Sequence, residues 1–151
     1  MIRRRVMMGL LGLLALGAAC RKREELKVGR EEAGDIPREV ALQKLRDLLP
    51  TAESAACTAP KEYYKASEVK EWSVGSDVLR VVPLKEKDPV FAVAYADIRQ
   101  VRLDRLGKTF QVRLFAPPQA DPAKDFLTFT WKSEEAAKQV VELLEAMRLR
   151  K

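Results

Sequence analysis

Two cysteines are the residues of this 151-residue chain whose side chains are best suited to covalent chemistry. A thiol can be acylated, can join a disulfide or, as a thiolate, can act as a nucleophile. Cys20 follows the small residues Gly17, Ala18 and Ala19, whereas Cys57 lies well inside the chain. The chain contains no histidine, the commonest general base and metal ligand, which excludes most hydrolytic triads and zinc sites.

The stretch before Cys20 has the parts of an export signal. Three arginines at 3–5 form a positively charged start, and an apolar segment follows at 6–16. That segment is too short to span a bilayer as a helix, which takes roughly 20 residues. The residues after Cys20 are abruptly charged, so we predict that residues 1–19 are a signal peptide.

The end of this segment, Leu16-Gly17-Ala18-Ala19-Cys20, resembles the lipobox of bacterial lipoproteins. In that family the cysteine thiol carries a diacylglycerol and becomes the new amino terminus. The resemblance implies lipidation of Cys20 and a place in the cell envelope on the exported side of a membrane, although Gly17 stands where the family usually has a larger aliphatic residue. Ordinary cleavage after Ala19 and an uncleaved amino-terminal anchor are the alternatives.

Cys57 is the cysteine left over when Cys20 is lipidated. We interpret it as a small buried hydrophobic residue, since no flanking histidine or metal pattern favours a reactive thiol. A disulfide with Cys20 is an alternative when Cys20 is not acylated. An intermolecular disulfide and a reactive thiol are the others.

Arg102 and Arg113 are the candidate binding residues. A two-residue turn at Gly107-Lys108 places them directly opposite each other on the outer face of a hairpin. Directly opposed like charges are unfavourable. Either Asp104 on the diagonal compensates them on a solvated face, or the pair binds an acidic protein or an anionic lipid surface.

The charge balance argues against a nucleic-acid partner. Three of the 28 basic side chains belong to the predicted signal peptide. The remaining 25 exceed the 22 acidic side chains by three, so the net charge after cleavage is about +3. The sequence has no phosphate-binding loop, nucleophile elbow or dinucleotide-binding motif. We therefore expect no cofactor and no metal.

Hydrophobic periodicity predicts the elements that carry these residues. A run of mixed charge at 20–36 is interpreted as a flexible tether, a helix is predicted at 37–49, and 51–66 is interpreted as a loop or irregular helix. The period then changes to two, which predicts strands at 69–74, 78–84, 90–95, 98–105, 109–115 and 126–131.

The carboxyl-terminal helix is the clearest element. Ser133 is a good N-cap, and the two glutamates after it lie in the first turn, where the helix dipole favours them. Trp72 and Trp131 fall on apolar phases of their strands and are predicted core residues. The helix has an apolar stripe that we expect to face the same core: Ala137, Val140, Val141, Leu144 and Met147.

The order of short antiparallel strands and one closing helix resembles the pleckstrin-homology-like fold over about residues 67–150. The bent strand at 93–101 and the strand, serine cap and helix start at 127–137 carry the resemblance. It implies a small barrel or bent sheet with a helix closing one end. Basic residues on the first two strands often bind anionic headgroups in that family, and the matching residues here are Lys70 and Arg80.

Gly75-Ser76 is a second plausible two-residue turn, with glycine in the first central place as a type II′ turn requires. Its register sets Trp72 opposite Leu79 and Glu71 opposite Arg80. We therefore interpret Arg80 as one half of a structural ion pair.

Together these patterns predict an α+β protein in three parts: the signal peptide, the charged tether and one domain at 37–151. The domain is predicted to contain an N-terminal helix, five or six short antiparallel strands and a C-terminal amphipathic helix. Mixed charge and an ordinary apolar fraction of 47% are typical of one globular domain.

The predicted function is that of a non-catalytic binding or assembly module, held on the membrane by the lipid on Cys20. One alternative is a binder of anionic lipid surfaces that acts through Arg102 and Arg113. A second alternative is a minor enzyme that uses Cys57 or carboxylates.

Overall fold

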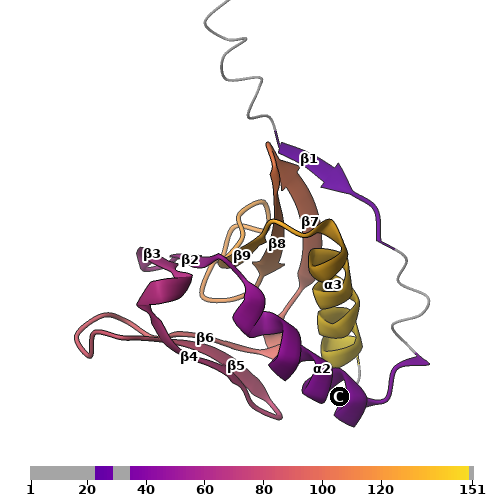
Figure 1. Ribbon diagram of the computed structural model, residues 1–151, viewed down its shortest axis with the longest axis horizontal. Helices are drawn as coiled ribbons and strands as arrows, with labels where there is room; N and C mark the ends of the chain where they lie inside the picture. The colour runs from indigo at the N-terminus through magenta and orange to yellow at the C-terminus, as the bar shows by residue number, and fades with distance from the viewer. Residues whose placement is uncertain (1–22, 29–34, 150–151) are drawn as a thin grey trace, which may run out of the picture.

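The computed structural model describes residues 23–28 and 35–149, so the predicted signal peptide and Cys20 lie outside the described residues. Within them the chain is an α+β protein with two antiparallel sheets and two α-helices (Figure 1). The helices are α2 (Arg38–Leu48) and α3 (Glu134–Leu149). The strands are β1 (Arg23–Leu26), β2 (Ser54–Thr58), β3 (Lys61–Lys65), β4 (Val69–Val74), β5 (Val78–Pro83), β6 (Phe91–Ala94), β7 (Gln100–Leu106), β8 (Thr109–Phe115) and β9 (Leu127–Trp131).

The large sheet has the strand order β1-β7-β8-β9-β2-β3, and the small sheet has the order β4-β5-β6. Helix α3 packs on β7, β8 and β9 from one side, and α2 packs on α3 and β4 (Figure 1). The small sheet meets the other half of the large sheet through aromatic rings. The ring centres of Trp72 and Phe129 lie 6.2 Å apart, and the ring of Tyr64 stacks on that of Phe91 with 4.6 Å between the ring centres. One apolar core thus lies between the large sheet and its cover of helices and small sheet.

The carboxyl-terminal helix follows its prediction. Ser133 Oγ accepts a hydrogen bond from the backbone N–H of Ala136 over 3.1 Å, which caps the first turn. All five residues of the predicted apolar stripe are buried, and Trp131 is buried beside them. Trp72 is half-buried and packs against the same core. Burial of this stripe is what holds α3 on the sheet, since helix propensity alone contributes little.

The six predicted strands correspond to β4 through β9, and the Gly107-Lys108 turn has the predicted register. Leu103 lies opposite Val112, and Val101 lies opposite Leu114. Gly107 has a φ of +66°, a left-handed conformation that glycine adopts at little cost. A two-residue turn leaves the strands no freedom to slip, which is why this register could be predicted.

The register predicted for β4 and β5 is wrong by two residues. The Gly75 N–H donates to the carbonyl of Val78 over 3.0 Å, so the turn is centred on Ser76 and Asp77, one residue later than the predicted Gly75-Ser76 turn. Trp72 therefore lies opposite Val81, and Arg80 lies opposite Ser73. Because the shift is an even number, the apolar side chains still face the core.

The strand count was underestimated, because β1, β2 and β3 were not predicted. β2 and β3 occupy the stretch that we interpreted as a loop or irregular helix, and β1 lies within the predicted tether. The domain therefore begins before residue 37, and α2 is preceded by a strand. Across residues 23–28 and 35–149 the strands form two separate sheets and no closed barrel, so of the two expected forms, a small barrel or a bent sheet, the barrel is wrong.

β1 is a strand because its neighbour supplies the partners that its own sequence lacks. Leu26 lies opposite Leu103 and packs against the core, and Glu25 lies opposite Asp104. The carboxylate of Glu25 lies 3.4 Å from Nη2 of Arg102. Backbone pairing with β7 thus replaces the flexible tether over Arg23–Leu26.

Candidate functional site

Arg102 and Arg113 lie directly opposite each other across β7 and β8, as predicted. Their predicted exposure is wrong for Arg113, which is only 9% exposed. The two arginines belong to a charge cluster on the outer face of the large sheet, which we call the Arg113 cluster: Arg23, Glu25, Arg102, Asp104, Arg113 and Asp125.

Two carboxylates neutralise Arg113. Its Nη1 donates to Oδ2 of Asp104 over 2.8 Å, and its Nε donates to Oδ2 of Asp125 over 2.9 Å. Thr128 adds a hydrogen bond from its hydroxyl to the same oxygen of Asp125 over 2.7 Å. Asp104 is 0% exposed and is also approached by Arg102 at 3.5 Å. Asp104, placed on the diagonal by the sequence, is therefore the centre of the cluster.

Desolvation and hydrogen bonding act in opposite directions on Arg113. Burial by itself lowers the pKa of its guanidinium, but the hydrogen bonds to Asp125 and Asp104 outweigh burial and raise the pKa above its usual value. The guanidinium also lies 5.1 Å from the ring centre of Phe115. Arg113 is thus a permanent cation whose Nε and Nη1 donors are already used within the protein.

The ion pairs of the Arg113 cluster therefore stabilise the large sheet, and they leave the cluster poorly suited to bind an external anion. An acidic partner would have to displace Asp104 or Asp125, one of which is fully buried. Asp125 and Glu25 were missed by sequence reasoning. Asp125 follows the irregular connection after β8, and Glu25 lies in the predicted tether, so strand periodicity could not place either.

The other end of the same sheet face is hollowed into a trough of about 720 Å³, which we call the hydroxyl trough. The ends of β2, β3, β8 and β9 and the η2 turn at Leu49–Thr51 form its floor and rim. Lys65 and Glu53 add one charge of each sign, and Glu53 lies 3.6 Å from Lys132. Six hydroxyl-bearing side chains line it: Thr51, Ser54, Tyr63, Ser67, Thr109 and Thr130.

Two of these hydroxyls are already used. Thr51 donates to the carbonyl of Leu48 and accepts from the indole of Trp131, and Thr109 donates to the carbonyl of Leu106. The hydroxyls of Ser54, Tyr63, Ser67 and Thr130 make no hydrogen bond to any described residue. The ring of Tyr63 is 57% exposed. An exposed ring beside unused hydroxyls can receive a polar ligand that also has an apolar face.

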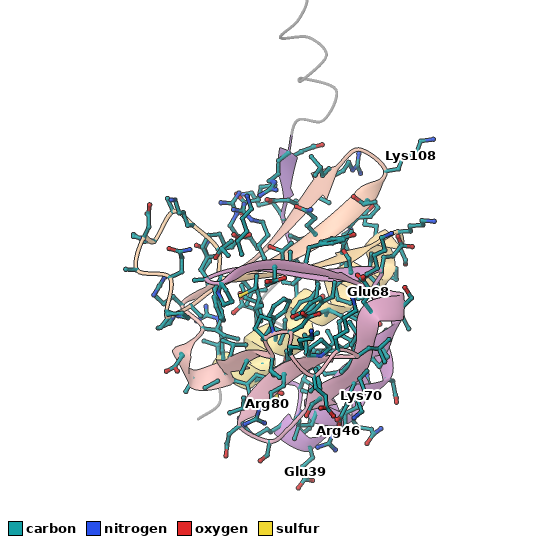
Figure 2. The ribbon with its side chains drawn as sticks, turned by 90° about the vertical axis from the view of Figure 1, so that its left-hand side faces the viewer. Glu39, Arg46, Glu68, Lys70, Arg80 and Lys108 are labelled. Carbon is teal, nitrogen blue, oxygen red and sulfur yellow. The ribbon has the colours of Figure 1, made fainter. Side chains whose placement is uncertain are left out.

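The remaining candidates do not assemble into a site. Cys57 is buried, as interpreted, and burial raises the pKa of its thiol, which disfavours the nucleophilic thiolate. Lys70 and Arg80 are exposed on the small sheet (Figure 2), and the predicted ion pair between Arg80 and Glu71 does not form because Glu71 lies opposite Val82.

Comparisons with known proteins add no family to these observations. No protein-family model, no curated protein and no solved structure matches the chain. Over residues 23–28 and 35–149, no helix is long and apolar enough to cross a membrane. The same residues contain no group of three or more side chains arranged to hold a metal ion.

Proposed function

We propose that this protein is a lipid-anchored protein of the bacterial cell envelope, and that its domain is a non-catalytic binding module. The anchor rests on the lipobox-like end of the first 20 residues. The position of β1 supports the proposal, because the large sheet begins at Arg23, only three residues after Cys20. The lipid anchor on Cys20 would then connect almost directly to β1, the edge strand of the large sheet.

The binding surface in this proposal is the hydroxyl trough. Its unused hydroxyls on Ser54, Ser67 and Thr130 can donate and accept hydrogen bonds, and the exposed ring of Tyr63 offers an apolar face. A saccharide has the matching chemistry, with hydroxyls around its rim and C–H groups on its ring faces. The single observation that carries the assignment is this combination of an exposed tyrosine with hydroxyls that no described residue uses.

The pleckstrin-homology-like resemblance is part of the proposal. Two antiparallel sheets followed by one C-terminal helix support it. The departures are the strands β1, β2 and β3 ahead of the expected region and the separation of the two sheets. Headgroup binding by Lys70 and Arg80, which the resemblance would imply, is not included, because the trough lies on a different sheet.

The anchor is tested by replacing Cys20. The native chain should partition into the detergent phase with the mass of a diacylglycerol on its first residue, and Cys20→Ser should be released into the aqueous phase or stay unprocessed. An unmodified chain that begins at Cys20 would contradict the lipid anchor.

The binding module is tested with two saccharide probes, isolated peptidoglycan and vesicles that contain a glycolipid. Tyr63→Ala should weaken binding about tenfold, because a stacked ring contributes on the order of 1 kcal/mol. Leu84→Ala is the matched control, since Leu84 is 56% exposed and lies on the small sheet's side of the molecule. The probe that Tyr63→Ala loses identifies the source of the saccharide, and equal binding by both variants would contradict the trough as its site.

A further inference from the structure

The start of β1 lies beside the tip of the hairpin formed by β7 and β8. Arg23 is the Cα partner of Leu106, the last residue of β7 before the Gly107-Lys108 turn. Figure 1 shows the beginning of β1 at the same end of the molecule as the turn. Neighbouring strands lie roughly 5 Å apart, so Arg23 and the hairpin tip (residues 106–109) form one end of the large sheet.

This end is covalently close to the anchor. Arg23 is the third residue after Cys20, and three residues span at most about 11 Å even when fully extended. A lipid on Cys20 therefore holds Arg23 within that distance of the bilayer surface. The hairpin tip is one strand away, so it is held there too. Because Arg23–Leu26 is paired with β7, only the short connection from Cys20 to Arg23 is left for the domain to change its orientation relative to the bilayer.

We propose that the hairpin tip is a membrane-contact surface, which rests on the bilayer that holds the anchor and fixes the orientation of the domain. This inference rests on the lipid anchor proposed above. The partner is a bilayer that contains anionic headgroups. Its contact residues are Arg23, Arg105 and Lys108, together with the polar turn.

The charges of this end fit such headgroups. The side chains of Arg23 and Arg105 are 40% and 44% exposed, and each has one long ion pair, to Asp104 at 3.7 Å and to Glu134 at 3.8 Å respectively. Lys108 projects from the tip of the hairpin, away from the body of the molecule (Figure 2). Basic side chains near an anionic surface are attracted to it, which is enough to bias the orientation of a domain that is already tethered.

The opposite end of the molecule then faces away from the membrane. Arg46, Lys70 and Arg80 lie at the end far from Lys108 in Figure 2. Positive charge alone would allow either end to meet an anionic surface. The short connection from Cys20 to β1 is what selects the Lys108 end.

The test compares labels at the two ends of the lipidated full-length protein in vesicles that contain anionic lipid and a headgroup quencher. Lys108→Cys and Arg80→Cys, each in a Cys57→Ala background, receive the same fluorophore, and folding of each variant is checked by circular dichroism. Quenching at position 108 should be several-fold greater than at position 80. Equal quenching, or more at position 80, on chains whose mass shows the lipid would overturn the orientation while leaving the anchor intact. A chain without the lipid would overturn both.

A charge-reversed pair of variants separates the headgroup contact from the geometry of the anchor. With the label moved to Ser76→Cys in the far turn, Lys108→Glu should increase headgroup quenching of the label, because the domain loses its preferred orientation. Arg80→Glu is the matched control and should leave that quenching unchanged. Identical quenching in both variants would overturn the contribution of Lys108.

Discussion

The guanidinium Nη1 of Arg113 donates to Oδ2 of Asp104 over 2.8 Å on a sheet face where Asp104 has no solvent exposure. This contact shows that the two arginines paired across β7 and β8 are compensated by a carboxylate. Opposed like charges would be a liability on an open face. Here they share the buried carboxylate of Asp104, so the first role of Arg102 and Arg113 is to stabilise the sheet.

Asp104→Ala should destabilise the domain by about 3–5 kcal/mol, because it leaves Arg113 buried with only Asp125 to compensate it. Arg102→Gln is the control and should cost less than about 1 kcal/mol, since its ion pairs are more exposed. Urea unfolding followed by tryptophan fluorescence measures both. A repulsive arginine pair would instead make Arg113→Gln slightly stabilising, so a more stable Arg113→Gln variant would contradict the cluster.

Leu144→Asp should unfold the domain or cost several kcal/mol, because Leu144 is fully buried in the face of α3 that packs on the large sheet. Gln139→Asp places the same residue on the exposed side of α3 and should be tolerated. Thermal unfolding followed by circular dichroism compares the two. Equal melting temperatures would show that α3 is not docked through Leu144.

Stability should fall at alkaline pH because of two buried tyrosines. Burial raises the pKa of Tyr64 and of Tyr95 to about 12. The nearby carboxylate of Asp88 adds to this rise at Tyr64, whereas Arg38 and Arg46 oppose it at Tyr95 without cancelling it. The neutral hydroxyl of Tyr95 donates to the carbonyl of Gly75 over 2.9 Å. An unfolded tyrosine ionises near pH 10, so the stabilisation is complete below about pH 10 and is lost as the pH rises towards 12.

Denaturant midpoints between pH 8 and pH 11 measure this loss. Tyr95→Phe should be less stable at pH 8 by about 1 kcal/mol, because its hydrogen bond is gone, but its stability should fall less steeply above pH 10. Parallel curves for the native chain and the variant would exclude Tyr95 as a source of the alkaline dependence.

Cys57 should react with a thiol reagent at least about 100-fold more slowly in the folded protein than in denaturant, since a buried thiol with a raised pKa reacts only through local opening. The Cys20→Ser chain isolates this thiol. Absorbance of the released chromophore follows the reaction at neutral pH. Fast labelling of the folded chain would revive a reactive role for Cys57.

Much of the fold could be predicted from local pattern. The bounds of β4 and β8 are those that the two-residue period predicts, and Ser133 caps α3 where the sequence places it. The Gly107-Lys108 turn set Arg102 opposite Arg113 because a two-residue turn determines its own register. These features depend on residues that are close in sequence, so their physics is readable in the chain.

The rest required distant partners. β1 has one apolar residue in Arg23–Leu26, and it is a strand only because the edge of β7 offers backbone groups and Arg102 offers a counter-charge to Glu25. The hydroxyl trough combines side chains from strands that are far apart in sequence. No local period indicates such a combination.

The sequence by itself therefore determined the α+β class, six strands, the C-terminal helix and the pairing of the two arginines. Tertiary structure decided that the Arg113 side chain is buried between Asp104 and Asp125, and that the chain joins the sheet at Arg23. The physical reason is that alternation and turn length are local properties. Burial and charge compensation depend on which segments the completed sheet brings together.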